Sequence, residues 1–205
     1  MGSVLENGLF AIGQVMRLPV MVLLWGCVIA AVYVAASCLM EALLRRRERA
    51  AFRLTAWLSR GGVLQADDAR RAELPGYLRV LLEEIRGRLS AARLDDGDLE
   101  NLILEREERL RGSLALPRSL VRIGPSLGLI GTLIPMGASL ASLASGNLQA
   151  MAGQMVVAFT TTIIGLATGT LAYVVAAVRQ KWASEAIREQ RYLAERMAVE
   201  MDARS

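Results

Sequence analysis

Hydroxyl side chains are the main candidates for chemistry in a long apolar segment near the C-terminus. The sequence VAFTTTIIGLATGT, residues 157–170, contains five threonines but no charged residue, no proline and no histidine. On a helix of about 100° per residue, most of these threonines fall on the same face as the smallest residues of the segment. This face holds Thr161, Thr162, Gly165, Thr168 and Gly169. Hydroxyl oxygens can act as ligands for a cation without carrying a charge of their own.

A second apolar segment, residues 124–142, is sorted in the same way. Leu129, Leu133 and Leu140 lie on one side of its helical wheel, and small or mildly polar residues lie on the other. The small face holds Pro125, Gly128, Gly131, Thr132, Pro135 and Ser139. Two interpretations fit both segments. Small residues at four-residue spacing allow close packing of helices, and a row of hydroxyls can line an ion path. Helical periodicity does not separate the two.

Charge is segregated along the chain in the manner of a membrane protein. The protein has 205 residues and 54% of them are hydrophobic, yet the stretches 18–40 and 123–178 contain no charged residue. A hydrocarbon core is crossed by about 20 helical residues, and a charge at its centre costs several kcal/mol. The first stretch is long enough for one crossing and exceeds the core of a signal peptide. The second suits two crossings, joined by a short turn near SGN at 145–147.

These lengths predict an all-α integral membrane protein with three transmembrane helices. The spans are expected at 18–40, 123–144 and 154–178. The remaining segments are 1–17 and the turn 145–153, both expected to face outward, and the cytoplasmic regions 41–122 and 179–205. This N-out, C-in topology follows from the basic residues beside the spans, because loops rich in Arg and Lys stay in the cytoplasm. Arg45, Arg46, Arg47 and Arg49 are expected to set the topology and to contact anionic lipid headgroups.

The two cytoplasmic regions are predicted to be helical. Leucine and isoleucine recur at helical spacing over 78–89 after Pro75, and Asp98 is expected to cap the start of another helix. The tail after Lys181 carries a weakly apolar seam at alternating four- and three-residue steps. The seam consists of Ala183, Ile187, Gln190, Ala194, Met197 and Met201. It suits packing on the cytoplasmic helices of the same chain or on a neighbouring subunit.

Several functional classes are disfavoured by the composition. The chain has no histidine, so zinc sites and most general-base catalysis lack their usual residue. Cys27 and Cys38 lie about 16 Å apart along a helix, too far for a disulfide. The net charge of +4 is explained by arginines beside the spans, where acidic residues are almost as numerous. We expect no enzymatic activity, no metal, no cofactor and no nucleic-acid partner.

Two motifs resemble a known family. PSLGLIGT, residues 125–132, and TTIIGLATG, residues 161–169, are similar to the core of the last two spans in the MotA/TolQ/ExbB proton-channel family. The resemblance implies a homo-oligomeric ring, a pentamer, in a bacterial or archaeal inner membrane. It also implies a dimer of single-span MotB/ExbD/TolR-like partners that carry a membrane Asp, and passage of H⁺, alternatively Na⁺.

The resemblance also assigns roles to residues. Thr132 and Thr162 match threonines that face the partner's carboxylate, and Pro125 matches the proline associated with coupling ion passage to movement. Thr161, Thr168 and Ser139 are expected on the same path. Close approach of the partner helix is expected at Gly128, Gly131, Pro135, Gly165 and Gly169. The glutamate that many ExbB- and TolQ-like members carry early in the third span is absent here, where Val157 lies nearby.

The sequence therefore favours an ion-conducting ring subunit that couples proton or sodium motive force to mechanical work. Three spans favour the ExbB- and TolQ-like arrangement over the flagellar one, whose ring subunit has four. The alternative is a non-conducting helical scaffold that organises a membrane complex.

Overall fold

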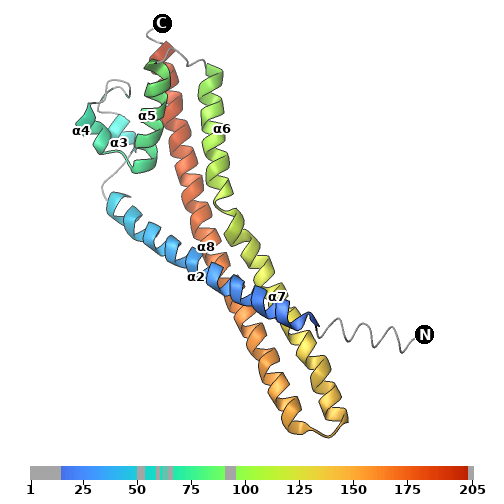
Figure 1. Ribbon diagram of the computed structural model, residues 1–205. Helices are drawn as coiled ribbons and strands as arrows, with labels where there is room; N and C mark the ends of the chain where they lie inside the picture. The colour runs from blue at the N-terminus through green and yellow to red at the C-terminus, as the bar shows by residue number, and fades with distance from the viewer. Residues whose placement is uncertain are drawn as a thin grey trace. The chain divides into compact units, whose positions relative to one another are not determined.

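The computed structural model describes residues 15–49, 54–58, 61, 63, 67–90 and 96–202, and its regular structure there is entirely helical (Figure 1). The helices are α2 (Arg17–Arg49), α3 (Leu54–Leu58), α4 (Asp68–Ala72), α5 (Gly76–Ser90), α6 (Asp96–Gly112), α7 (Ala115–Ala144) and α8 (Leu148–Asp202). The chain forms two compact units. One comprises Met1–Cys38 with Ala115–Ala177, and the other comprises Leu39–Leu114 with Val178–Ser205.

Three helical stretches are long and apolar enough to cross a membrane. They are Arg17–Arg45, Glu100–Ala144 and Leu148–Glu200. The predicted all-helical class with three candidate spans is therefore confirmed by length and composition. In both longer stretches the helix continues past a membrane border that the sequence predicts. Helix α7 begins at Ala115, before the predicted span 123–144, and α8 ends at Asp202, after the predicted span 154–178.

The first unit is built on the pairing of α7 with the first part of α8 (Figure 1). Helix α2 contributes one buried stripe at steps of three, four and seven residues, as expected for a single helical face. The stripe consists of Val20, Leu24, Ala31, Val34 and Cys38. Val20 and Leu24 pack with Leu127 of α7, and Cys27, Ile134 and Ile164 border this cluster. The opposite face of α2, including Trp25 and Ile29, is exposed.

The turn between α7 and α8 consists of Ser145, Gly146 and Asn147, so it is shorter than the predicted 145–153. Gly146 has φ +76° and Asn147 N donates to Ser142 O at 2.9 Å, which closes α7 in a Schellman motif. The Oδ1 of Asn147 then accepts from Ala150 N at 3.0 Å and caps the start of α8. Each turn residue thus ends one helix or begins the next, and α8 starts at Leu148.

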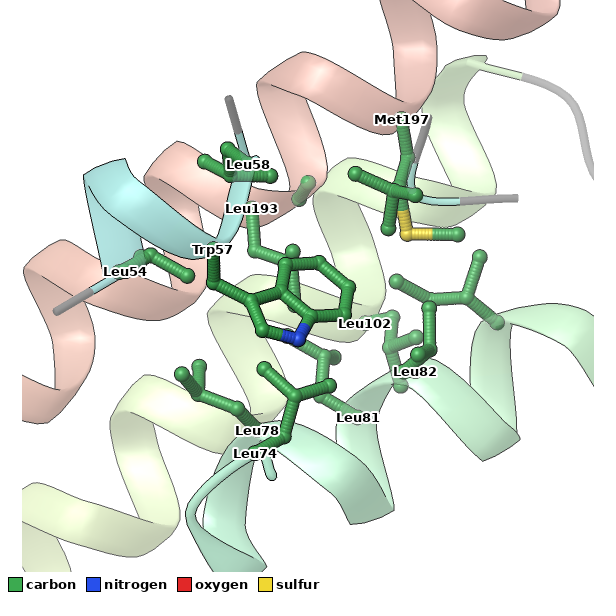
Figure 2. Close-up of a cluster of buried hydrophobic side chains, with 13 residues drawn as sticks. Leu54, Trp57, Leu58, Leu74, Leu78, Leu81, Leu82, Leu102, Leu193 and Met197 are labelled. Atoms are coloured by element: carbon green, nitrogen blue, oxygen red, sulfur yellow. The ribbon is translucent and has the colours of Figure 1, made fainter. Parts of the chain in front are cut away.

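The second unit has its own apolar core, to which α3, α5, α6 and the C-terminal part of α8 contribute. Figure 2 shows the indole of Trp57 among leucines of these helices, with Met197 nearby. The core residues on α5 are Leu78, Leu81, Leu82 and Ile85, all 0% exposed. They follow Pro75 at the predicted helical spacing, and α5 begins directly after that proline.

Polar contacts fix the segment around Trp57. The indole N–H donates to Arg70 O at 2.9 Å, and the guanidinium of Arg70 lies 4.8 Å from the ring centroid of Trp57.

Between α5 and α6, the hydrogen bond from Arg106 holds the pKa of Glu84 below its usual value, with Arg88 adding a second favourable charge. The ion pair of Arg106 with Glu84 links α5 to α6.

Part of the predicted tail seam packs within its own chain, while Ile187 is only half-buried. Ala183, Gln190, Ala194 and Met197 are buried, and Ala194 and Met197 belong to the core of the second unit. Of the two packing modes that the sequence allowed, the intramolecular one is confirmed for these two residues. The side chain of Met201 lies outside the described part. The expected cap at Asp98 is wrong, because α6 begins at Asp96 and Asp98 lies inside the helix.

Replacing Trp57 with alanine is expected to lower the free energy of unfolding by about 3–5 kcal/mol, because it opens a large cavity. It also removes the donor to Arg70 O. The melting temperature of the purified protein in detergent measures the effect. Trp25→Ala is the matched control, since Trp25 is 66% exposed. An equal loss of melting temperature in both variants would contradict this account of the core.

Candidate ion pathway

Helices α7 and α8 approach each other backbone to backbone, and glycines make the approach possible. A Cβ at Gly165 would lie 2.7 Å from Gly124 O and 2.7 Å from Gly128 Cα, inside van der Waals contact. A Cβ at Gly128 would lie 3.1 Å from Thr161 O. No side chain larger than hydrogen fits at Gly165 unless the helices move apart. The small-residue spacing seen in the sequence is thus the contact surface of the α7–α8 pair.

Pro125 lies in the same contact. A Cβ at Gly169 would lie 2.6 Å from Pro125 Cγ and 3.4 Å from Val121 O. A proline has no N–H, so Pro125 cannot donate to Val121 O, the carbonyl four residues earlier. That carbonyl, left without its usual helical donor, faces the backbone of Gly169. Pro135, one turn beyond Gly131, is buried, whereas Pro125 is half-buried.

Three of the five predicted path hydroxyls are buried in this contact. Thr161 is 5% exposed and lies against Gly131, where a Cβ would be 3.0 Å from Thr161 Oγ1. Thr168 is also buried, and Ser139 Oγ donates across the pair to Met151 O at 3.3 Å. Within the single chain, Thr161 and Thr168 donate to carbonyls of their own helix, and Ser139 donates to the other helix of the pair. Their place on a partner-facing path stays a prediction.

The other two predicted hydroxyls, Thr132 and Thr162, are only half-buried. Thr132 Oγ1 donates to Leu129 O at 2.7 Å. Thr162 Oγ1 donates to Ala158 O at 3.4 Å, and Thr161 donates to the same carbonyl at 2.8 Å. A hydroxyl whose proton is held by the backbone still has lone pairs for a cation or an O–H donor. Because its own bond is long and shared, the Thr162 hydroxyl is the easier one to redirect.

The glycines assigned to helix approach perform that role inside the chain. Gly124, Gly128 and Gly131 of α7 face Gly165, Gly169 and Thr161 of α8. Close approach of a partner helix to these same glycines stays a prediction. The residues opposite the contact are large, apolar and exposed, as the helical wheels predict. They are Leu129, Leu133, Leu140, Phe159, Ile163, Leu166 and Val174. Such faces suit lipid or neighbouring apolar helices.

Gln154 is a polar residue that the site prediction left out. It lies one turn before Ala158, on the small face of α8, and its Oε1 is buried with no hydrogen-bond partner among the described residues. Its place among the small residues on the helical wheel of the third span is the sequence signal that points to it. The side chains of Arg46, Arg47 and Arg49 lie outside the described part, while Arg45 pairs with Glu41 at 2.7 Å. The predicted role of these arginines in topology is untested.

Three helical stretches with apolar runs long enough to cross a membrane, two of them packed together through glycine, indicate a multi-pass helical membrane protein. Residues 80–191, more than half of the chain, match the MotA/TolQ/ExbB proton channel family. The chain belongs to this family. The match runs from α5 into α8 and includes both motifs noted in the sequence, whereas α2 lies outside it. No curated protein matches the chain at a significant level.

Replacing Gly165 with alanine is expected to destabilise the α7–α8 pair by about 1–3 kcal/mol, because a new methyl group meets backbone atoms. Gly153→Ala in the same helix is the control, since nothing lies within 4 Å of a Cβ there. Melting temperature and the yield of folded protein on size exclusion in detergent measure both variants. If Gly165→Ala is as stable as Gly153→Ala, the close contact does not exist.

Proposed function

We propose that this chain is the ion-conducting ring subunit of an inner-membrane complex that couples proton, or sodium, motive force to mechanical work. Family membership supports a proton-channel role in an energy-transducing complex. The uncharged run over 123–178 supports it as well, because the two spans offer hydroxyls but no carboxylate. The chain acts in transport rather than catalysis, and H⁺ or Na⁺ is what it moves, without a cofactor.

The accessibility of Thr132 and Thr162 is the observation that carries the proposal. Both hydroxyls donate to carbonyls of their own helix and keep lone pairs free, and both are half-buried rather than enclosed. A cation or a protonated carboxyl group can therefore be met by oxygen acceptors without an opposing charge on this chain. Thr161 and Thr168 contribute indirectly, because they pack between α7 and α8 and stabilise the helix pair that carries the two accessible hydroxyls.

The titrating group then belongs to a partner. No Asp or Glu lies in 18–40 or 123–178, so the membrane carboxylate must come from a second subunit if protons are carried by one. A dimer of single-span MotB/ExbD/TolR-like subunits, each with a membrane Asp, supplies it inside a pentameric ring of this chain. A ring without that partner conducts poorly. Residues 41–122 and 179–205 face the cytoplasm in this arrangement, and the turn at 145–147 faces outward.

A non-conducting scaffold is the second candidate. Burial of Thr161, Thr168 and Ser139 inside the α7–α8 contact favours it, because those hydroxyls already have a structural use. A scaffold needs no accessible oxygen at Thr132 or Thr162, and this difference separates the two functions.

Replacing both Thr132 and Thr162 with valine is expected to reduce ion flux by about tenfold or more, because the two changes together remove oxygen ligands worth about 1.4 kcal/mol or more. Flux is measured with a pH-sensitive dye in proteoliposomes that hold the complex purified from its own host. Thr170→Val is the matched control, since Thr170 is exposed and bonded back to Leu166 O at 2.9 Å.

Assembly is followed by native mass in the same preparations. The channel proposal expects the double variant to assemble normally, with five copies of this chain and two partner copies, while conducting weakly. Undiminished flux in the double variant would favour a different path, and a wild-type complex with no flux under either a proton or a sodium gradient would favour the scaffold.

A further inference from the structure

Two arginines and a tryptophan of the second unit line a cavity that the ion path does not use. The cavity has a volume of about 260 Å³, and its polar lining comes from Glu41, Arg45, Ser113, Arg179 and Trp182. This volume lies just below the about 300–1,000 Å³ typical of small-molecule pockets, so it suits a small polar headgroup better than a large cofactor.

The lining of this cavity carries more positive than negative charge. Glu41 is held by Arg45, whose Nε and Nη2 lie 2.9 and 2.7 Å from Glu41 Oε1. Arg179 Nε lies 4.0 Å from Glu41 Oε2. Two guanidinium groups and one carboxylate thus line the cavity, and these lining residues carry a net charge of +1. Arg45 Nη1 is shielded from solvent and has no hydrogen-bond partner among the described residues.

The Arg45 guanidinium is also fixed in place by aromatic rings. It lies 5.1 Å from the ring centroid of Trp182 and 6.0 Å from that of Tyr77. The side chains of Arg45 and Arg179 are only 21% and 19% exposed. Preorganised, partly desolvated guanidinium groups bind phosphate oxygens more strongly than flexible surface arginines do.

The cavity lies where apolar chain gives way to charge. Glu41 is the first charged residue after the apolar run 18–40, and Arg179 is the first after 123–178. On α2, large apolar residues next to Glu41 and Arg45 are exposed. They are Leu39, Met40, Leu43 and Leu44. A ligand held here can place an anion against the arginines and a hydrocarbon chain against α2. Tryptophan is typical of this membrane depth.

We propose that this cavity binds the phosphate of an anionic phospholipid headgroup. The ligand chemistry is a phosphate monoester or diester held by Arg45 Nη1 and Arg179, with Glu41 orienting both arginines. The adjacent apolar surface favours a lipid over free phosphate. This site is distinct from the general attraction of a basic segment to headgroups, because it is a defined cavity made by residues from three parts of the sequence. It does not depend on ion conduction.

Binding is tested by native mass spectrometry of the full-length protein in detergent. Short-chain phosphatidylglycerol, phosphatidylcholine and inorganic phosphate are titrated separately. We expect wild-type protein to retain phosphatidylglycerol in preference to phosphatidylcholine. Arg179→Gln and Arg45→Lys are each expected to raise the dissociation constant for phosphatidylglycerol about tenfold, because each removes charge-assisted hydrogen bonds. Arg45→Lys retains the charge and serves as the milder variant if neutral substitutions fail to fold.

Arg122→Gln is the matched control, since Arg122 is exposed, lies beside the run 123–178 and is outside the cavity. Unchanged binding in this control supports a defined site. An equal loss in Arg122→Gln overturns it in favour of diffuse attraction, and equal retention of phosphatidylglycerol and phosphatidylcholine overturns it because the site then does not select an anionic headgroup. Displacement of the lipid by an equal concentration of inorganic phosphate overturns the lipid assignment. Because no ion gradient is applied, failure here is separate from failure of the channel proposal.

Discussion

The close contact between the backbones of α7 and α8 is the constraint on which the membrane part of the chain depends. Lipid tails are as apolar as leucine, so burial of large side chains gives little drive for helix association in a bilayer. Dispersion between closely approaching backbones provides the attraction instead. Gly165, packed on Gly124 and Gly128, makes that approach possible. Once this contact is set, the large side chains of both helices can only point outward.

The same contact divides the hydroxyls into two groups with different chemistry. Thr161, Thr168 and Ser139 lie within or beside the glycine surface and are enclosed by it. Thr132 and Thr162 lie at its margin and keep part of their surface accessible. Every one of these side chains donates its proton to a backbone carbonyl, which makes a hydroxyl tolerable in an apolar setting. A hydroxyl can therefore be stable in an apolar setting without being accessible to an ion. Of these five side chains, only Thr132 and Thr162 are both hydrogen-bonded to the backbone and partly accessible.

Much of this arrangement could be predicted from the sequence. Charge distribution gave three candidate spans, and the helical wheels correctly separated the small faces from the large apolar ones. The wheels could not tell what a small face contacts, because a glycine stripe has the same period whether it meets its own chain or another. Residues such as Thr161 and Thr162 are adjacent in sequence, yet one is enclosed and the other is not. That difference depends on where Gly131 and Gly128 fall across the contact, which periodicity does not report.

The three-residue turn between α7 and α8 also affects how the protein enters the membrane. Ser145, Gly146 and Asn147 carry no charge, and part of their backbone and side-chain hydrogen bonding is satisfied by the two helix ends. In the proposed topology this turn crosses the bilayer during synthesis, and carrying an uncharged turn across costs far less than carrying a charged loop. The two helices can therefore be inserted together as a preformed hairpin that is already packed through its glycines. Neither helix then has to insert alone and associate with the other afterwards.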